Sequence, residues 1–89
     1  MPYTSGRLIA GSTNLDTNAA PISSTAHAIR ETLVQADPAN STNVLVGDVS
    51  SQTIVLTPGA SMTVPIISLS RIYAKMASGT GTVNWFARD

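Results

Sequence analysis

Apolar and polar residues alternate in short runs along the second part of the chain. The alternating runs cover residues 53–57, 60–67, 71–76 and 82–88, and residues 43–47 form a short β-branched run that ends at a glycine. Alternation with a period of two is typical of β-strands that bury one face. Because residues that favour turns separate the runs, the pattern predicts an all-β fold, a small antiparallel β-sandwich or barrel of six to seven strands.

Residues 29–48 form the stretch on which the rest of this prediction depends. We interpret it as two extended segments joined by a polar turn, a central hairpin against which the other segments pair or pack. Pro38 has no amide donor and pushes Asp37 towards extended geometry, so regular pairing has to end there. Asp37, Asn40 and Asn43 can satisfy loop amides with their side chains.

A helix is the alternative for the first of these segments. Ala26, Ile29, Leu33 and Ala36 fall at helical spacing, and a serine or threonine just before them could act as a cap. Such a helix would be short, and the chain beyond it has the pattern of strands. The strand is the favoured interpretation, and the helix stays open at this point.

Three turn signals divide the later strands. Pro58 and Gly59 suit the second and third positions of a type II turn. Pro65 interrupts a strand pattern, which indicates an edge strand or a bulge. Residues 78–81 (SGTG) predict a hairpin loop. The side chains expected in the core are Leu33, Val44, Val46, Leu56, Met62, Val64, Ile66, Ile72, Ala74, Val83 and Trp85.

The N-terminal part lacks a sustained period. Residues 1–25 contain isolated apolar residues among Ser, Thr, Asn, Ala and Gly. One interpretation is a disordered terminus or a first edge strand. The other is an arm that becomes ordered across a second subunit. We therefore divide the chain into an extended N-terminal arm, residues 1–28, and a β-sandwich domain, residues 29–89.

Composition narrows the classes of function. The chain has 89 residues, enough for one domain, with 43% hydrophobic residues, 11% charged residues and a formal net charge of zero. A neutral surface promotes association, and it does not favour nucleic acid, which needs a basic excess. Cysteine is absent, and no apolar run approaches a membrane span. We expect a soluble protein without nucleic-acid or membrane partners.

The residues that could carry chemistry are sparse. His27 is the single histidine, and the five carboxylate side chains lack the spacing of a metal site. Gly79 and Gly81 lack the helix-opening context of a nucleotide-binding loop. Tyr73 and Trp85 suit core or interface packing better than stacking on bases or sugars. We predict no enzyme, no catalytic residues, no cofactor and no metal.

The order of the motifs carries a resemblance. Ile29-Arg30 precedes VQADPAN (residues 34–40), VLVG (44–47), LTPGAS (56–61), LSRIY (69–73) and VNW (83–85). This succession, over about two-thirds of the chain, resembles small virion proteins of tailed bacteriophages. These motifs are turn and strand signatures, so they indicate the β-sandwich unit more firmly than its role.

The resemblance implies a structural protein of the capsid cement, or decoration, type. Such proteins bind the major capsid protein on the outer surface of the shell, commonly as homotrimers, so the expected location is the virion, assembled in the host cytoplasm. The alternative is a head or tail fibre module that binds a host surface glycan or receptor. From the residues themselves we expect subunit contacts at Leu8, Ile9, Leu15, Ile22, Tyr73 and Phe86.

Overall fold

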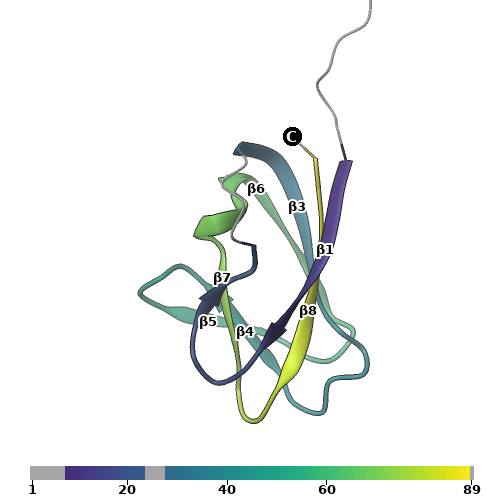
Figure 1. Cartoon of the computed structure of the whole chain (residues 1–89), viewed down its shortest axis with the longest axis vertical. Helices are drawn as coiled ribbons and strands as arrows, with labels where there is room; N and C mark the ends of the chain where they lie inside the picture. The colour runs from purple at the N-terminus through teal and green to yellow at the C-terminus, as the bar shows by residue number, and fades with distance from the viewer. Residues whose placement is uncertain (1–7, 24–27, 89) are drawn as a thin grey trace, which may run out of the picture.

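Two antiparallel four-stranded sheets pack face to face in the computed structural model, which describes residues 8–23 and 28–88 (Figure 1). The long sheet has the order β1-β8-β3-β6 and the short sheet the order β2-β7-β4-β5. This architecture confirms the predicted all-β sandwich, with eight strands in the described residues. The strand favoured for the first of the two organising segments is confirmed as β3, and the helical alternative is wrong.

The strands of the two sheets differ in length. The long sheet consists of β1 (Leu8–Leu15), β8 (Gly81–Arg88), β3 (Ala28–Ala36) and β6 (Ser61–Ser68). The short sheet consists of β2 (Ala20–Pro21), β7 (Tyr73–Met76), β4 (Val44–Gly47) and β5 (Gln52–Leu56). A 3₁₀ turn, η1 (Leu69–Arg71), connects β6 to β7.

Most connections cross from one sheet to the other. β3 lies in the long sheet and β4 in the short sheet, so the predicted central hairpin is wrong. The hairpin loop predicted at residues 78–81 is also wrong, because it connects β7 and β8, which lie in different sheets. Alternation shows which face of a strand is buried, and it cannot show whether the next strand lies beside it or opposite. Residues 29–48 nevertheless keep their organising role, because β3 and β4 are each paired on both sides.

The polar loop after β3 works as predicted. The Asp37 carboxylate accepts a hydrogen bond from the amide of Ala39 at 2.8 Å. The Asn40 side chain bonds both backbone groups of Thr82, donating to the carbonyl at 2.8 Å and accepting from the amide at 2.9 Å. This side chain therefore fastens the loop between the sheets to the start of β8.

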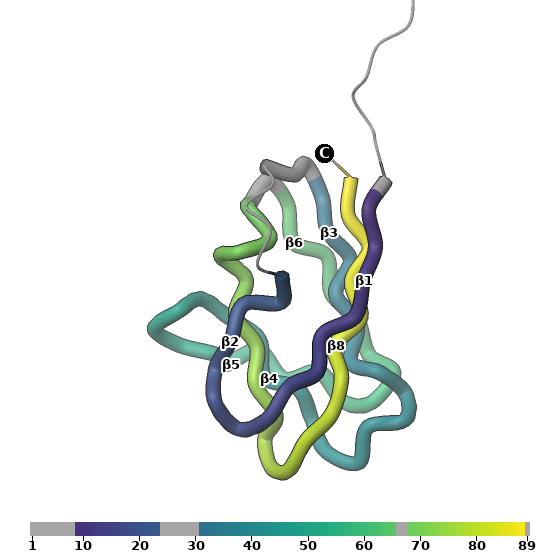
Figure 2. The backbone as a smooth tube through the Cα atoms, viewed as in Figure 1, coloured from purple at the N-terminus to yellow at the C-terminus, as the bar shows by residue number. Residues whose placement is uncertain are grey.

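The N-terminal segment belongs to the sandwich. Figure 2 shows β1 running alongside β8, and eight consecutive residues of β1 pair with it. β2 pairs with β7 in the other sheet. Leu15 and Ile22 are buried in the core. The predicted arm is thus wrong for residues 8–23, because their isolated apolar residues have pockets within the same chain; residues 1–7 and 24–27 lie outside the described part.

The predicted core is largely correct in the later strands. Val44, Val46, Leu56, Ile72, Ala74 and Val83 are buried, and Met62, Val64 and Trp85 pack against them. Leu33 is an error: it is 43% exposed, whereas its neighbours Thr32 and Val34 are buried. The helical alternative and the strand place different residues inside, and alternation along β3 selects Val34 over Leu33. The side chain of Ile66 lies outside the described set.

Two proline signals are confirmed. Gly59 has a φ of +88°, and the amide of Ala60 donates to the carbonyl of Thr57 at 2.8 Å, as a type II turn at Pro58 and Gly59 requires. Pro65 lies in β6, the outermost strand on one side of the long sheet. Its missing amide therefore interrupts no ladder inside the sheet.

Candidate interaction surfaces

The β4–β5 hairpin projects to one side of the sandwich (Figure 1). Val49 in its turn is 66% exposed, and Ile54 and Val55 in β5 are 49% and 53% exposed. Successive residues of a strand face opposite ways, so β5 presents apolar side chains on both faces. We call Val49, Ile54 and Val55 the hairpin patch.

The hairpin patch lies on a strand without protection at its edge. Proteins blunt the outer strands of a sheet with prolines, charges or very short length. β6 contains Pro65, and β2 is two residues long and contains Pro21, whereas β1, like β5, is an outer strand with no proline and no charge. β5 (QTIVL) has no proline and no charge, and in the described structure it pairs with β4 alone. Such an edge favours contact with another polypeptide.

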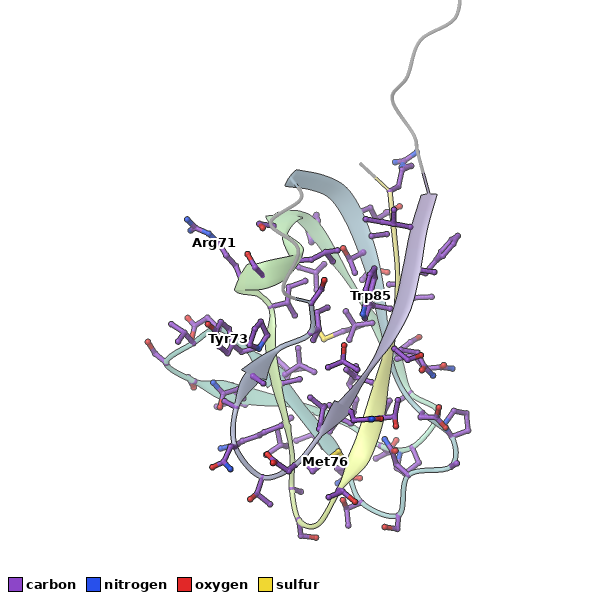
Figure 3. All side chains as sticks on the ribbon, in the orientation of Figure 1. Arg71, Tyr73, Met76 and Trp85 are labelled. Atoms are coloured by element: carbon purple, nitrogen blue, oxygen red, sulfur yellow. The ribbon has the colours of Figure 1, made fainter. Side chains whose placement is uncertain are left out.

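An apolar slot adjoins the hairpin where the two sheets part. The hollow measures about 200 Å³. Its apolar walls are formed by Val46, Ile54, Met62, Val64 and Ile72. Asp48 and Arg71 stand at its polar border, and Arg71 points away from the body of the molecule (Figure 3). A side chain from another protein that entered this slot would meet hydrophobic atoms from both sheets.

The second surface is the solvent side of the long sheet, the outer face. Its central strands carry three cross-strand pairs: Arg88 opposite Glu31, Phe86 opposite Leu33, and Asn84 opposite Gln35. Phe86 is 49% exposed. Arg88 and Glu31 form an ion pair at 3.9 Å. The Asn84 amide donates to Gln35 at 3.3 Å. The face therefore has a charged row, an apolar row and an amide row.

All three aspartates in the described residues, Asp16, Asp37 and Asp48, accept hydrogen bonds in turns. Asp16 accepts from the amide of Asn18 at 2.8 Å, and Asp48 accepts from the amides of Ser50 and Ser51 at 2.9 and 2.8 Å. Such side-chain bonds replace missing backbone partners in loops. Among the described residues, His, Cys, Asp and Glu side chains form no group of three that could hold a metal ion. His27 lies outside the described residues.

The six predicted contact residues have different environments. Leu15 and Ile22 are buried in the chain's own core, which removes them as contacts between subunits. Ile9 is partly buried against that core. Tyr73 is half-buried on β7 beside the β4–β5 turn (Figure 3), and Phe86 is exposed on the outer face. Leu8 lies in β1, and its side chain is outside the described set.

Sequence reasoning missed the hairpin patch and Leu33. The one sequence feature that indicates the patch is an absence: residues 52–57 contain no charge and no proline, the residues that protect an edge strand. Nothing in the local pattern shows that β5 is an outer strand, because that depends on pairing in the other sheet. The partner of Phe86 was missed because Leu33 was placed in the core.

Comparison with known proteins bears on the fold. No protein-family model matches the chain, and no curated protein matches it. The structure is similar to the crystal structure of protein NMB1881 from Neisseria meningitidis, with a TM-score of 0.58 and 10% sequence identity, covering 100% of this chain and 88% of that one. At this identity the likeness shows the β-sandwich fold alone.

In the part of the chain that the structure describes, no helix is long and apolar enough to span a membrane.

Proposed function

We propose that the chain is a structural virion protein of a tailed bacteriophage, a capsid cement protein that binds the outer surface of the shell formed by the major capsid protein. The observation that carries the proposal is the hairpin patch, a projecting apolar edge on a small neutral sandwich. Three exposed apolar side chains lie on this one projecting hairpin, and a concentration of exposed apolar surface is a feature of sites of protein contact.

The hairpin is the part of the molecule that contacts the shell in this proposal. Val49 and Val55 expose apolar surface, and the free edge of β5 offers backbone donors and acceptors to an extended segment of the capsid protein. Addition of a strand to an exposed edge supplies affinity through main-chain hydrogen bonds, while pockets beside the edge select side chains. The slot beside Ile54 provides such a pocket.

Many weak contacts are sufficient for a cement protein. Each copy would bind a repeated lattice, and oligomers that attach at several points gain from the high effective concentration of the later contacts. The absence of net charge in the sequence lets neighbouring copies approach without general repulsion. The homotrimer is implied by the resemblance alone, and attachment to the shell does not require that oligomeric state.

The test uses virions and shells of the phage that encodes the chain. Full-length protein is added to shells that lack it, and bound protein is quantified after sedimentation. Val49→Lys and Val55→Lys should each weaken attachment at least about tenfold, because a charge must be desolvated at the contact. Thr80→Lys adds the same charge in the exposed loop between β7 and β8 and should bind like the natural chain.

Copy number separates this function from its rival. A cement protein is expected in hundreds of copies per virion, quantified against the major capsid protein by mass spectrometry, and should not bind bacterial cells. A fibre module that binds a host glycan or receptor would be present in few copies and would bind cells. Few copies, or attachment unaffected by both lysine variants, would overturn the proposal.

A further inference from the structure

On the outer face of the long sheet, the residues paired between β8 and β3 are chemically complementary. Across the boundary between β8 and β3, a cation lies opposite an anion, an aromatic ring opposite a branched aliphatic chain, and one amide opposite another. These pairs are Arg88 with Glu31, Phe86 with Leu33, and Asn84 with Gln35. In each row the two members complement one another.

This arrangement is what a face needs in order to bind a copy of itself. Consider a two-fold axis that lies above the outer face, runs parallel to the strands and is centred between β8 and β3. The axis exchanges the two strands, so β8 of one copy lies over β3 of the other. Arg88 then faces Glu31 of the second copy, Phe86 faces Leu33 and Asn84 faces Gln35. Every contact occurs twice, as in any isologous interface.

We propose that the chain forms a homodimer through the outer face of its long sheet, in the register set by these three rows. Charge complementarity selects the second copy as the occupant. The Arg88 and Glu31 side chains are 51% and 57% exposed, so each can also pair across an interface. A displacement by one strand would break the match between cation and anion.

The shape of the face fits the same partner. A shallow hollow of about 290 Å³ beside the apolar row is lined by Leu33, Thr63, Phe86 and the charged pair. In the dimer, the Phe86 ring of the second copy is directed towards Leu33 at this hollow. Two sheets that pack in an aligned way lie about 10 Å apart, with their side chains interdigitated.

The size of the face sets the strength to be expected. Four strands about 4.8 Å apart and about 27 Å long cover roughly 500 Å² on each copy. The total of about 1,000 Å² is at the lower limit for a specific interface. We therefore expect a weak dimer, seen as an increase in mass with concentration. This proposal does not depend on a role in a virion, and a two-fold pair differs from the trimer that the resemblance implies.

Charge reversal provides the test, with sedimentation equilibrium of the full chain as the measurement. Arg88→Glu places like charges opposite one another in a dimer, as does Glu31→Arg, so each variant should weaken dimerisation at least about tenfold. An equal mixture of the two variants should form heterodimers, because the carboxylate introduced at position 88 of one chain would then face the guanidinium introduced at position 31 of the other. Recovery in the mixture cannot be explained by misfolding of either variant.

Arg71→Glu is the matched control, since it reverses an exposed cation on η1, away from the outer face. It should dimerise like the natural chain. A chain that stays monomeric up to about millimolar concentration, a trimer, or a dimer that is insensitive to both reversals would each overturn the proposal. So would binding of soluble glycans at the outer face of a monomer, which would assign this surface to a different ligand.

Discussion

The two sheets contain the same number of strands and differ in nearly everything else. In the long sheet every strand has eight or nine residues, whereas the strands of the short sheet have two to five. The long sheet is paired in continuous register from β1 to β6. The short sheet has a register shift next to Gly47 and an apolar outer strand.

This difference indicates that the long sheet provides the stability of the fold and that the hairpin of the short sheet provides the surface for contact with another protein. The long sheet buries one face, where the side chains of Val34, Val83 and Ala87 are at most 1% exposed. In the short sheet, β5 extends past the core, and its Ile54 and Val55 remain half-exposed. We infer that the long sheet determines whether the chain folds, and that the hairpin of the short sheet can be altered without loss of the fold.

The largest effect should follow from deletion of residues 1–23. This deletion removes β1 from the long sheet and β2 from the short sheet, together with the buried Leu15 and Ile22. The lost burial exceeds what a domain stable by about 5–15 kcal/mol can lose. We expect the shortened chain to show no cooperative thermal unfolding by circular dichroism.

Addition in trans provides the control for the deletion. A synthetic peptide of residues 1–23 supplies β1 and β2 again, so it should restore the strand signal of the shortened chain. If the shortened chain unfolds cooperatively without the peptide, the N-terminal segment is dispensable and the comparison between the sheets fails.

The part of this structure that could be predicted from sequence was the part set by local pattern. Alternation identified the buried faces of β7 and β8, and the turn chemistry at Pro58–Gly59 and Asp37 was correct. The pairing of β1 with β8 joins residues from opposite ends of the chain, such as Ile9 with Ala87. No local signal reports such a pairing, so the predicted arm is wrong for β1, and the alternative of a first edge strand is the correct one.

The candidate surfaces were harder to predict for the same reason. Phe86 was correctly placed on the face opposite Val83 and Trp85. Its neighbour Leu33 was not, because helical spacing and strand alternation gave different buried faces to β3. Exposure of Val55 depends on β5 being the last strand of its sheet, which is a property of topology and not of residues 52–57.

An effect of intermediate size is expected from substitution of two valines, one in each sheet. Val34 in β3 is fully buried, whereas Val55 in β5 is 53% exposed. Val34→Ala should lower the free energy of unfolding by about 2 kcal/mol, through lost burial and the cavity left behind. Val55→Ala should change it by less than about 0.5 kcal/mol. Urea denaturation at low protein concentration measures both.

Equal losses for the two valines would mean that the hairpin is part of the cooperative core. Because the substitution is identical, differences in the unfolded chain largely cancel, and the comparison reports the native surroundings of each side chain. A loss confined to Val34 would support the long sheet as the source of stability.

The smallest effect concerns a polar group inside the long sheet. Thr32 is fully buried, and its hydroxyl has no hydrogen-bond partner among the described residues. A buried hydroxyl without a partner costs about 1 kcal/mol or more, and valine keeps nearly the same shape. Thr32→Val should therefore stabilise the chain by about 1 kcal/mol, which raises Tm by about 4–8 °C in a domain of this size.

Thr53→Val makes the same replacement on the exposed strand β5 of the short sheet and should leave Tm nearly unchanged at low concentration. A fall in Tm for Thr32→Val would show that the hydroxyl has a partner in the folded chain, in the segments outside the described residues or in bound water. A rise in Tm for Thr32→Val alone would show that the buried Thr32 hydroxyl lacks a hydrogen-bond partner. The long sheet would then fold despite this cost, because the apolar burial around Thr32 stabilises it by more.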